Sequence, residues 1–102
     1  MTASYPHLFS PISIGPVRLE NRIVKTAAQT YFFDSGERRF GPIAKAFYGA
    51  VARGGPGLII CETPAMEAPF KETDDRRHRV DDDRFLPDIE ALAAEVRSKS
   101  VV

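Results

Sequence analysis

The segment Pro42–Cys61, which reads PIAKAFYGAVARGGPGLIIC, decides the fold because its hydrophobic periodicity changes along its length. In its first half, apolar residues recur at helical spacing, which predicts a helix with one apolar face. This face consists of Ile43, Phe47 and Val51, with Ala44 and Tyr48 beside them. Pro42 suits the first turn of that helix, and the run Gly54-Gly55-Pro56 ends it.

The second half of the segment, GLIIC at residues 57–61, is a continuous apolar run without polar alternation. Such a run is typical of a parallel strand that is covered on both faces. Before the helix, residues 21–27 read NRIVKTA and form another strand candidate, with Ile23 and Val24 as its branched residues. A strand, a helix and a strand in this order predict two parallel strands joined by a right-handed crossover.

A hairpin and a second helix are predicted on either side of this unit. Residues 8–19, LFSPISIGPVRL, contain two short apolar runs around Gly15-Pro16, which predicts a β-hairpin. The second helix is predicted to begin between Asp83 and Pro87. Its apolar stripe consists of Ile89, Leu92, Ala93 and Val96. The acidic residues 81–83 suit the positive end of the helix dipole, so they predict a helix start rather than a metal site.

Composition and charge narrow the classes of function. Among the 102 residues, 43% are hydrophobic and 27% are charged, as in an ordinary globular domain. Lys and Arg together number 14, as do Asp and Glu, so no excess charge favours nucleic acid or a membrane surface as a partner. No apolar run approaches the roughly 20 residues that span a bilayer, and the first residues lack a signal-peptide pattern. Because Cys61 is the single cysteine, no internal disulfide can form, and we expect a cytoplasmic protein.

Three blocks of the sequence carry a family resemblance. They are LFSPISIGPVRLENRIV at 8–24, GGPGLIICET at 54–63 and DDDRFLPDIEALAAEVR at 81–97. The blocks resemble the amino-terminal part of the old yellow enzyme family, the FMN-dependent NAD(P)H:flavin oxidoreductases that include 2,4-dienoyl-CoA reductases. They are similar to the opening hairpin with the first strand, to the second strand and to the helix that follows. The order is also the same, so the resemblance covers residues 8–97.

The resemblance implies a (β/α)8 barrel, of which residues 1–102 would be the amino-terminal portion. It also implies that FMN lies across the carboxyl ends of the strands, the edge where barrel enzymes place their active sites. The cofactor-binding residues implied in this way are Thr26, Ala27, Ala28 and Gln29 after the first strand and Thr63 after the second. The small side chains would leave room for the flat ring, and the amide of Gln29 could bond to its polar edge. Tyr31 falls where some members place a tyrosine at the substrate pocket.

This chain departs from the commonest family pattern, which has Pro, then Met or Leu, then Thr or Cys at the positions of Ala27, Ala28 and Gln29. No catalytic residue of the family falls within the chain. A barrel of this type needs about 250 residues. We therefore expect an amino-terminal fragment that is inactive on its own.

For the complete enzyme, the resemblance implies hydride transfer from NAD(P)H through FMN to an electron-poor acceptor. The alternative is a non-catalytic truncated half-barrel that acts only through partner chains or has no function. In either case we expect the fragment to self-associate, because the apolar strand at residues 57–61 would have an unpaired edge.

Other interpretations need no cofactor. Without the resemblance, residues 26–29 are an ordinary transition from strand to loop. Cys61 lies in an apolar run and is predicted to be an inert, buried thiol. His7 and His78 lie in polar or terminal surroundings and are predicted to be surface residues. Glu62 is predicted to form hydrogen bonds with neighbouring backbone, with acid–base chemistry as the alternative.

Overall fold

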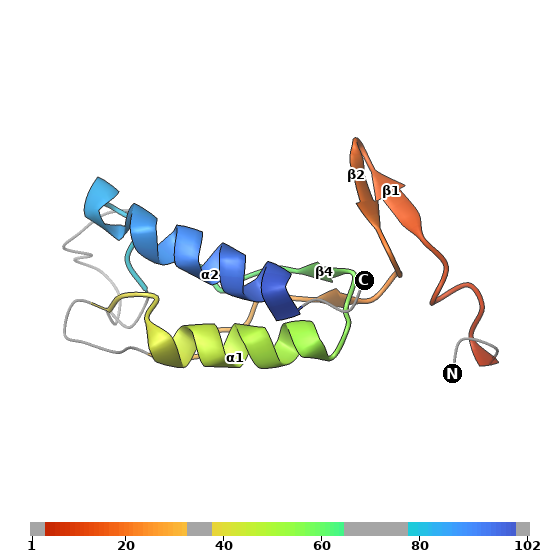
Figure 1. Cartoon of the computed structure of the whole chain (residues 1–102), viewed down its shortest axis with the longest axis horizontal. Coiled ribbons are helices and arrows are strands. Elements are labelled where there is room, and N and C mark those ends of the chain that lie inside the picture. Colours follow the sequence, from red (N-terminus) through yellow and green to blue (C-terminus); the bar gives the residue numbers. More distant parts are fainter. Residues whose placement is uncertain (1–3, 33–37, 65–77, 100–102) are drawn as a thin grey trace.

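The computed structural model describes residues 4–32, 38–64 and 78–99, which form two short sheets and two helices (Figure 1). In chain order the elements are β1 (Ile12–Ile14), β2 (Val17–Leu19), β3 (Val24–Lys25), α1 (Pro42–Arg53), β4 (Leu58–Ile59), the 3-10 turn η2 (Asp83–Phe85) and α2 (Leu86–Lys99). The predicted order of hairpin, strand, helix, strand and helix is confirmed.

The strands β1 and β2 form the predicted hairpin. They pair antiparallel, with Ile12 opposite Leu19 and Ile14 opposite Val17. Gly15 occupies the turn at a φ of 56°, a left-handed conformation that glycine adopts at little cost. The hairpin stands away from the helices (Figure 1), so the molecule is elongated, with extents of 49 × 25 × 24 Å.

The strands β3 and β4 are parallel neighbours, as predicted, and α1 connects them along the chain. Val24 is opposite Leu58 and Lys25 is opposite Ile59. Both strands are shorter than the predicted runs, but backbone hydrogen bonds extend the pairing at each end. The N–H of Gly57 donates to the Ile23 carbonyl at 2.9 Å, and the N–H of Ile60 donates to the Lys25 carbonyl at 2.9 Å.

The start of this parallel pair is fixed by the side chain of Asn21. Its Oδ1 accepts hydrogen bonds from the N–H groups of Ile23 at 3.0 Å and Gly57 at 2.8 Å. Its Nδ2 donates to the Gly55 carbonyl at 2.7 Å. One amide side chain therefore satisfies three backbone groups where β3 and β4 begin, and it sets their register.

The hydrophobic core lies between α1, α2 and β4. Its buried residues are Phe40, Ala44, Tyr48 and Leu92. The predicted face of α1 is confirmed at Ala44 and Tyr48, but its centre is shifted by one position, because Ile43 is 49% exposed. Small residues at 44, 49 and 52 let α1 lie close to its neighbours, and the larger apolar side chains flank the contact.

The second helix is confirmed, but only part of its predicted stripe is buried. Leu92 is buried, whereas Ile89, Ala93 and Val96 line an open groove of about 280 Å³ between α2 and β4.

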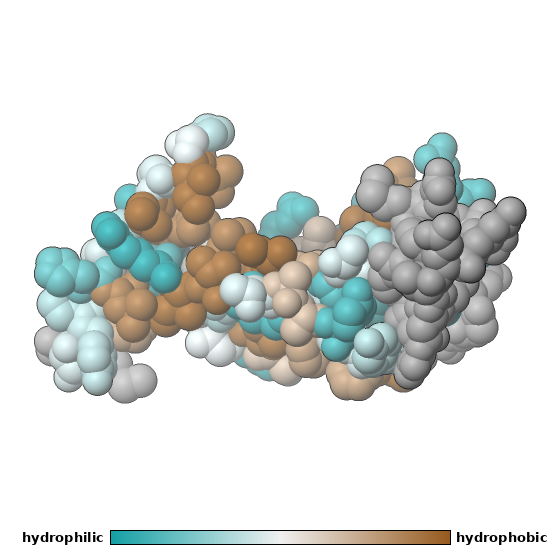
Figure 2. Space-filling model, turned by 180° about the vertical axis from the view of Figure 1, so that it is seen from behind, coloured by the Kyte–Doolittle hydropathy of each residue, from teal (hydrophilic) through white to brown (hydrophobic). Residues whose placement is uncertain are grey.

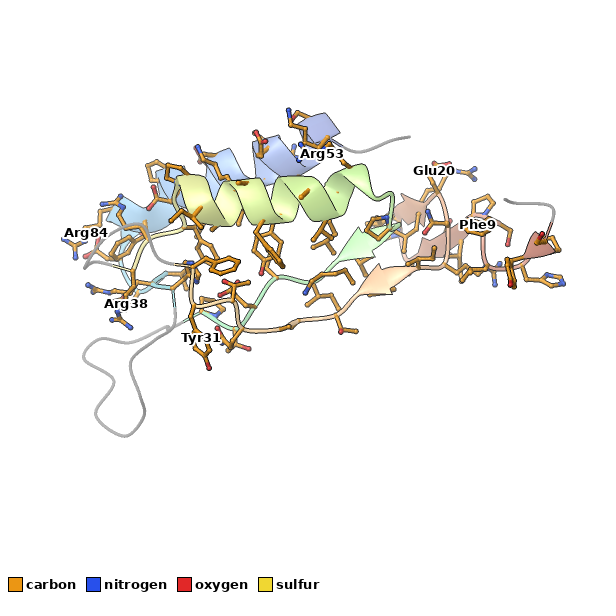
Figure 3. All side chains as sticks on the ribbon, turned by 90° about the horizontal axis from the view of Figure 1, so that it is seen from below. Phe9, Glu20, Tyr31, Arg38, Arg53 and Arg84 are labelled. Atoms are coloured by element: carbon orange, nitrogen blue, oxygen red, sulfur yellow. The ribbon has the colours of Figure 1, made fainter. Side chains whose placement is uncertain are left out.

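Helices cover one side of the β3–β4 sheet (Figure 3). The prediction that residues 57–61 are covered on both faces is wrong for the described residues, since Ile60 is 45% exposed. Seen from behind, hydrophobic surface runs from the hairpin toward the sheet (Figure 2).

The acidic residues before α2 begin the helical segment, as predicted. The carboxylate of Asp82 caps η2 by accepting from the N–H of Arg84 at 2.9 Å. Asp81 pairs with Arg79 at 2.6 Å, and Asp88 pairs with Arg39 at 2.8 Å, which ties the chain before α1 to α2. Within residues 4–32, 38–64 and 78–99, no group of three metal-binding side chains comes together, and no helix is long and apolar enough to cross a membrane.

We predict that Gly57→Ala lowers the free energy of unfolding by about 1–3 kcal/mol, the usual cost of an overpacked site. A Cβ at this position would overlap the carbonyl oxygen of Asn21 and approach its Oδ1 to 3.0 Å. Urea unfolding followed by circular dichroism measures the change. Ala46→Ser, which is at an exposed position of α1, is the control. An unchanged midpoint for Gly57→Ala would contradict the close approach of the two backbones.

We also predict that the 102-residue chain self-associates at roughly tens of micromolar, because apolar residues and strand edges are exposed together, a combination that causes aggregation at micromolar to millimolar concentrations. Ile60 beside β4 is 45% exposed, and the described part of its sheet has two strands. Ile60→Lys should shift the sedimentation coefficient toward that of the monomer, since a charge blocks edge pairing. Leu86→Lys, at a position 52% exposed on α2, should not. Equal effects of both variants would rule out the strand edge as the contact.

Candidate functional site

The candidate site is the edge of the β3–β4 sheet at which both strands end. Beyond the strands, residues 26–32 and 60–64 continue side by side, and Tyr31 lies at this end of the molecule (Figure 3). The sequence-predicted residues Thr26, Ala27, Ala28, Gln29 and Thr63 are all exposed here. The two groups of residues meet, because Nε2 of Gln29 donates to the Thr63 carbonyl oxygen at 2.9 Å.

Tyr31 has an unusual backbone conformation within this edge. Its φ is 58°, which is in the left-handed region that residues with large side chains rarely occupy. Its side chain is 53% exposed. The turn is held by the preceding residue, because the Thr30 hydroxyl oxygen accepts from the N–H of Phe32 at 3.2 Å. Backbone strain of this kind is found at functional sites and persists only when neighbouring contacts fix it.

Behind the exposed edge lies a buried carboxylate, Glu62, which is 2% exposed. The Tyr48 hydroxyl donates to its Oε2 at 2.8 Å, and the Thr30 hydroxyl contacts Oε1 at 3.0 Å and Oε2 at 2.9 Å. The N–H of Glu62 donates in turn to the Tyr48 oxygen at 3.0 Å. The sequence predicted that Glu62 bonds to neighbouring backbone, but the backbone donor here is the N–H of Thr30 at a long distance of 3.4 Å. Most hydrogen bonds to this carboxylate therefore come from side chains.

His78 completes the buried cluster. The prediction that it is a surface residue is wrong, because its side chain is fully buried. Its ring stacks on Phe40 with centroids 4.1 Å apart, and its Nε2 lies 2.9 Å from the Phe32 carbonyl oxygen. Its Nδ1 lies 2.8 Å from Oε1 of Glu62, so a buried imidazole and a buried carboxyl group are in direct contact. His7, by contrast, is exposed as predicted.

Burial controls the ionisation of two neighbouring groups. It raises the pKa of the Tyr48 hydroxyl well above its usual range, and the adjacent Glu62 carboxylate adds to this shift. Tyr48 therefore remains a hydrogen-bond donor at neutral pH. Cys61 was predicted to be buried and is instead exposed. Partial desolvation still raises the pKa of its thiol, so the thiol stays protonated and unreactive at neutral pH.

This arrangement suits binding at the exposed edge more than proton transfer there. Gln29 and Thr63 supply amide and carbonyl groups beside two alanines, a surface on which a flat polar molecule can lie. The titratable pair Glu62 and His78 is enclosed behind that surface. Sequence reasoning found the exposed residues and missed His78, since nothing in its polar surroundings indicates burial.

We predict that Tyr48→Phe lowers the free energy of unfolding by about 1–3 kcal/mol at neutral pH, because Glu62 loses one donor and its N–H loses an acceptor. The raised pKa adds a pH dependence. In the unfolded chain Tyr48 ionises near pH 10, about its reference value, whereas in the folded chain it ionises at higher pH. Unfolding thus becomes easier as pH rises above about 10, and the variant should lose less stability there.

Urea unfolding at several pH values, from neutral to alkaline, tests this prediction. Tyr5→Phe, at a position 63% exposed, is the matched control and should follow the parent chain throughout. If Tyr48→Phe and the parent lose stability in parallel at alkaline pH, the buried hydroxyl is not the cause.

Comparison with known proteins relates the chain to two redox proteins. No protein-family model matches it. It is 36% identical over 95 residues to a protein named metal reductase from Desulforamulus reducens, and 33% identical over 97 residues to an NADH oxidase from Thermoanaerobacter brockii. These alignments cover 90% and 92% of this chain but only 13% and 14% of the two relatives. The chain therefore spans about one seventh of their length.

Proposed function

We propose that this chain is the amino-terminal part of an FMN-dependent oxidoreductase of the old yellow enzyme type. In this proposal, β3, α1, β4 and α2 are the first two βα units of a (β/α)8 barrel, and the hairpin precedes them. Three matching blocks of sequence support the family, and the names of both relatives support redox chemistry. The parallel pairing of β3 with β4 is the geometry that such a barrel requires.

The observation that carries the proposal is the joining of residues 26–29 to Thr63 at the carboxyl edge of the strands. Active sites of barrel enzymes lie at this edge. The hydrogen bond from Gln29 to the Thr63 carbonyl holds the loop after β3 beside the loop after β4. A flat ring system can pack on an exposed surface that has small side chains and a fixed backbone.

The donor set of this edge fits FMN. Ala27 and Ala28 are exposed and leave the backbone accessible to a planar ring. The Gln29 amide uses one hydrogen in its bond to Thr63, so its second hydrogen and its Oε1 can bond to the polar edge of the isoalloxazine. FMN would supply hydride and electron transfer, and this chain would orient the ring and adjust its electron affinity. Tyr31 would border the substrate pocket.

NAD(P)H is the electron donor in this proposal, and the name of the Thermoanaerobacter relative supports NADH in particular. The acceptor is an electron-poor alkene or a similar compound. The name of the Desulforamulus relative is the reason to test a metal ion as a second acceptor.

A second candidate is a non-catalytic half-barrel that acts only through a partner chain. The open apolar groove between α2 and β4 favours it, because such a surface is usually covered in a folded protein. The two candidates make opposite predictions for the strand-end edge, since only the first requires that it bind flavin.

We predict that a chimera of the Thermoanaerobacter relative, with its matching segment replaced by residues 8–97 of this chain, copurifies with FMN and oxidises NADH. Gln29→Ala in the chimera should weaken FMN binding by about tenfold or less, the effect of one hydrogen bond of about 1 kcal/mol. Flavin fluorescence and absorbance measure both results. Ser98→Ala, at an exposed position of α2, is the control.

The isolated 102-residue chain should bind FMN weakly or not at all, because two strand ends provide only part of the binding surface of the barrel. Tight binding by the isolated chain would contradict the barrel proposal and favour a stand-alone flavin domain. A folded chimera without flavin would favour the non-catalytic candidate.

A further inference from the structure

The loop that carries Tyr31 is held from inside the protein at the residue on each side. On one side, the Thr30 hydroxyl contacts both oxygens of Glu62. On the other, the carbonyl of Phe32 lies 2.9 Å from Nε2 of His78. Tyr31 lies between these two anchors and adopts a φ of 58°. Its conformation therefore depends on Glu62 and His78, which contact the residues on either side of it.

The atoms around His78 define where its protons are. A carbonyl oxygen can only accept, so Nε2 beside the Phe32 carbonyl must carry a hydrogen. At 2.8 Å from Oε1 of Glu62, an unprotonated Nδ1 would face the oxygen with lone pair against lone pair. A proton on either of these two atoms removes the repulsion, so the pair Glu62–His78 holds one proton inside the protein.

The remaining contacts of Glu62 decide on which atom this proton resides. The Tyr48 oxygen accepts from the N–H of Glu62, and the Thr30 oxygen accepts from the N–H of Phe32. Both hydroxyl hydrogens are thereby directed at the carboxylate. Two hydroxyl donors stabilise the ionised form of a carboxyl group. The shared proton therefore belongs on Nδ1, which makes His78 an imidazolium.

We infer that Glu62 and His78 form a buried carboxylate–imidazolium pair that positions Tyr31 at the candidate site. Both are positioning residues, because they act on the site through the Thr30 hydroxyl and the Phe32 carbonyl. A buried pair of this kind contributes little net stability, but removal of one partner leaves the other charge buried and unmatched. The inference concerns the loop itself and stands whether or not a flavin binds there.

Nitrogen-15 NMR of the complete chain at neutral pH tests the protonation state. Both ring nitrogens of His78 should resonate as protonated, and Tyr31 should show the strong amide–Hα cross-peak of a positive φ. In Glu62→Gln, one His78 nitrogen should acquire the lone-pair shift, and the Tyr31 cross-peak should fall to the intensity of its neighbours. Amide signals of the β1–β2 hairpin, which stands away from the helices, report whether the variant remains folded (Figure 1).

Two further variants complete the design. His78→Gln retains a donor for the Phe32 carbonyl but carries no charge, so the Tyr31 cross-peak should weaken while the hairpin signals persist. Glu90→Gln removes an exposed carboxylate from α2 and should change neither signal. A lone-pair nitrogen in His78 of the parent chain would overturn the inference, as would His78 signals resembling those of the exposed His7. A Tyr31 cross-peak that survives Glu62→Gln would show that the pair does not position the loop.

Discussion

The burial of the Glu62 carboxylate is the constraint on which the other features of the strand-end edge depend. A carboxylate without partners in the interior costs several kcal/mol, so the surrounding chain must supply donors. Hydroxyl donors come from Thr30 after β3 and Tyr48 in α1, and the His78 ring before η2 lies 2.8 Å from the carboxylate. The requirement to satisfy one side chain therefore brings the loop after β3, the connecting helix and the returning chain to a single point behind the site.

Hydrophobic periodicity predicted the elements and their order because each element is encoded within a few residues. The hairpin around Gly15, the helix ended by Gly54-Gly55-Pro56 and the parallel pairing of β3 with β4 all follow from local patterns. The buried cluster could not be predicted in this way. Tyr48 and Thr30 lie 14 and 32 positions from Glu62, and His78 is in a run of charged residues. Only the tertiary fold brings them together.

Errors in the predicted burial have a common physical cause. A helical wheel weights large apolar residues, so Ile43, Phe47 and Val51 were placed at the centre of the buried face of α1, with Ala44 and Tyr48 beside them. Close packing instead selects small residues at the line of nearest approach, where Ala44, Gly49 and Ala52 lie beside Tyr48. In the same way, the apolar run 57–61 predicted a strand that is covered on both faces, yet Ile60 is 45% exposed. The composition of a strand does not indicate which other segment covers each face.

The exposed residues of the site could be predicted better than the buried ones, because their positions follow from the register of the strands. Val24–Leu58, Lys25–Ile59 and the contact of Gln29 with Thr63 all join residues 34 positions apart. Asn21 and Gly55, at the start of the sheet, have the same separation. The parallel alignment set by Asn21 thus continues past the ends of β3 and β4 to the candidate site. A slip of one residue would reverse the side chains of a strand, and it would also separate Gln29 from the Thr63 carbonyl. The three hydrogen bonds of Asn21, at the opposite end of the sheet, therefore determine which residues of the two strands meet at the candidate site. The contacts of Glu62 then hold the loop of residues 30–32 against the protein interior.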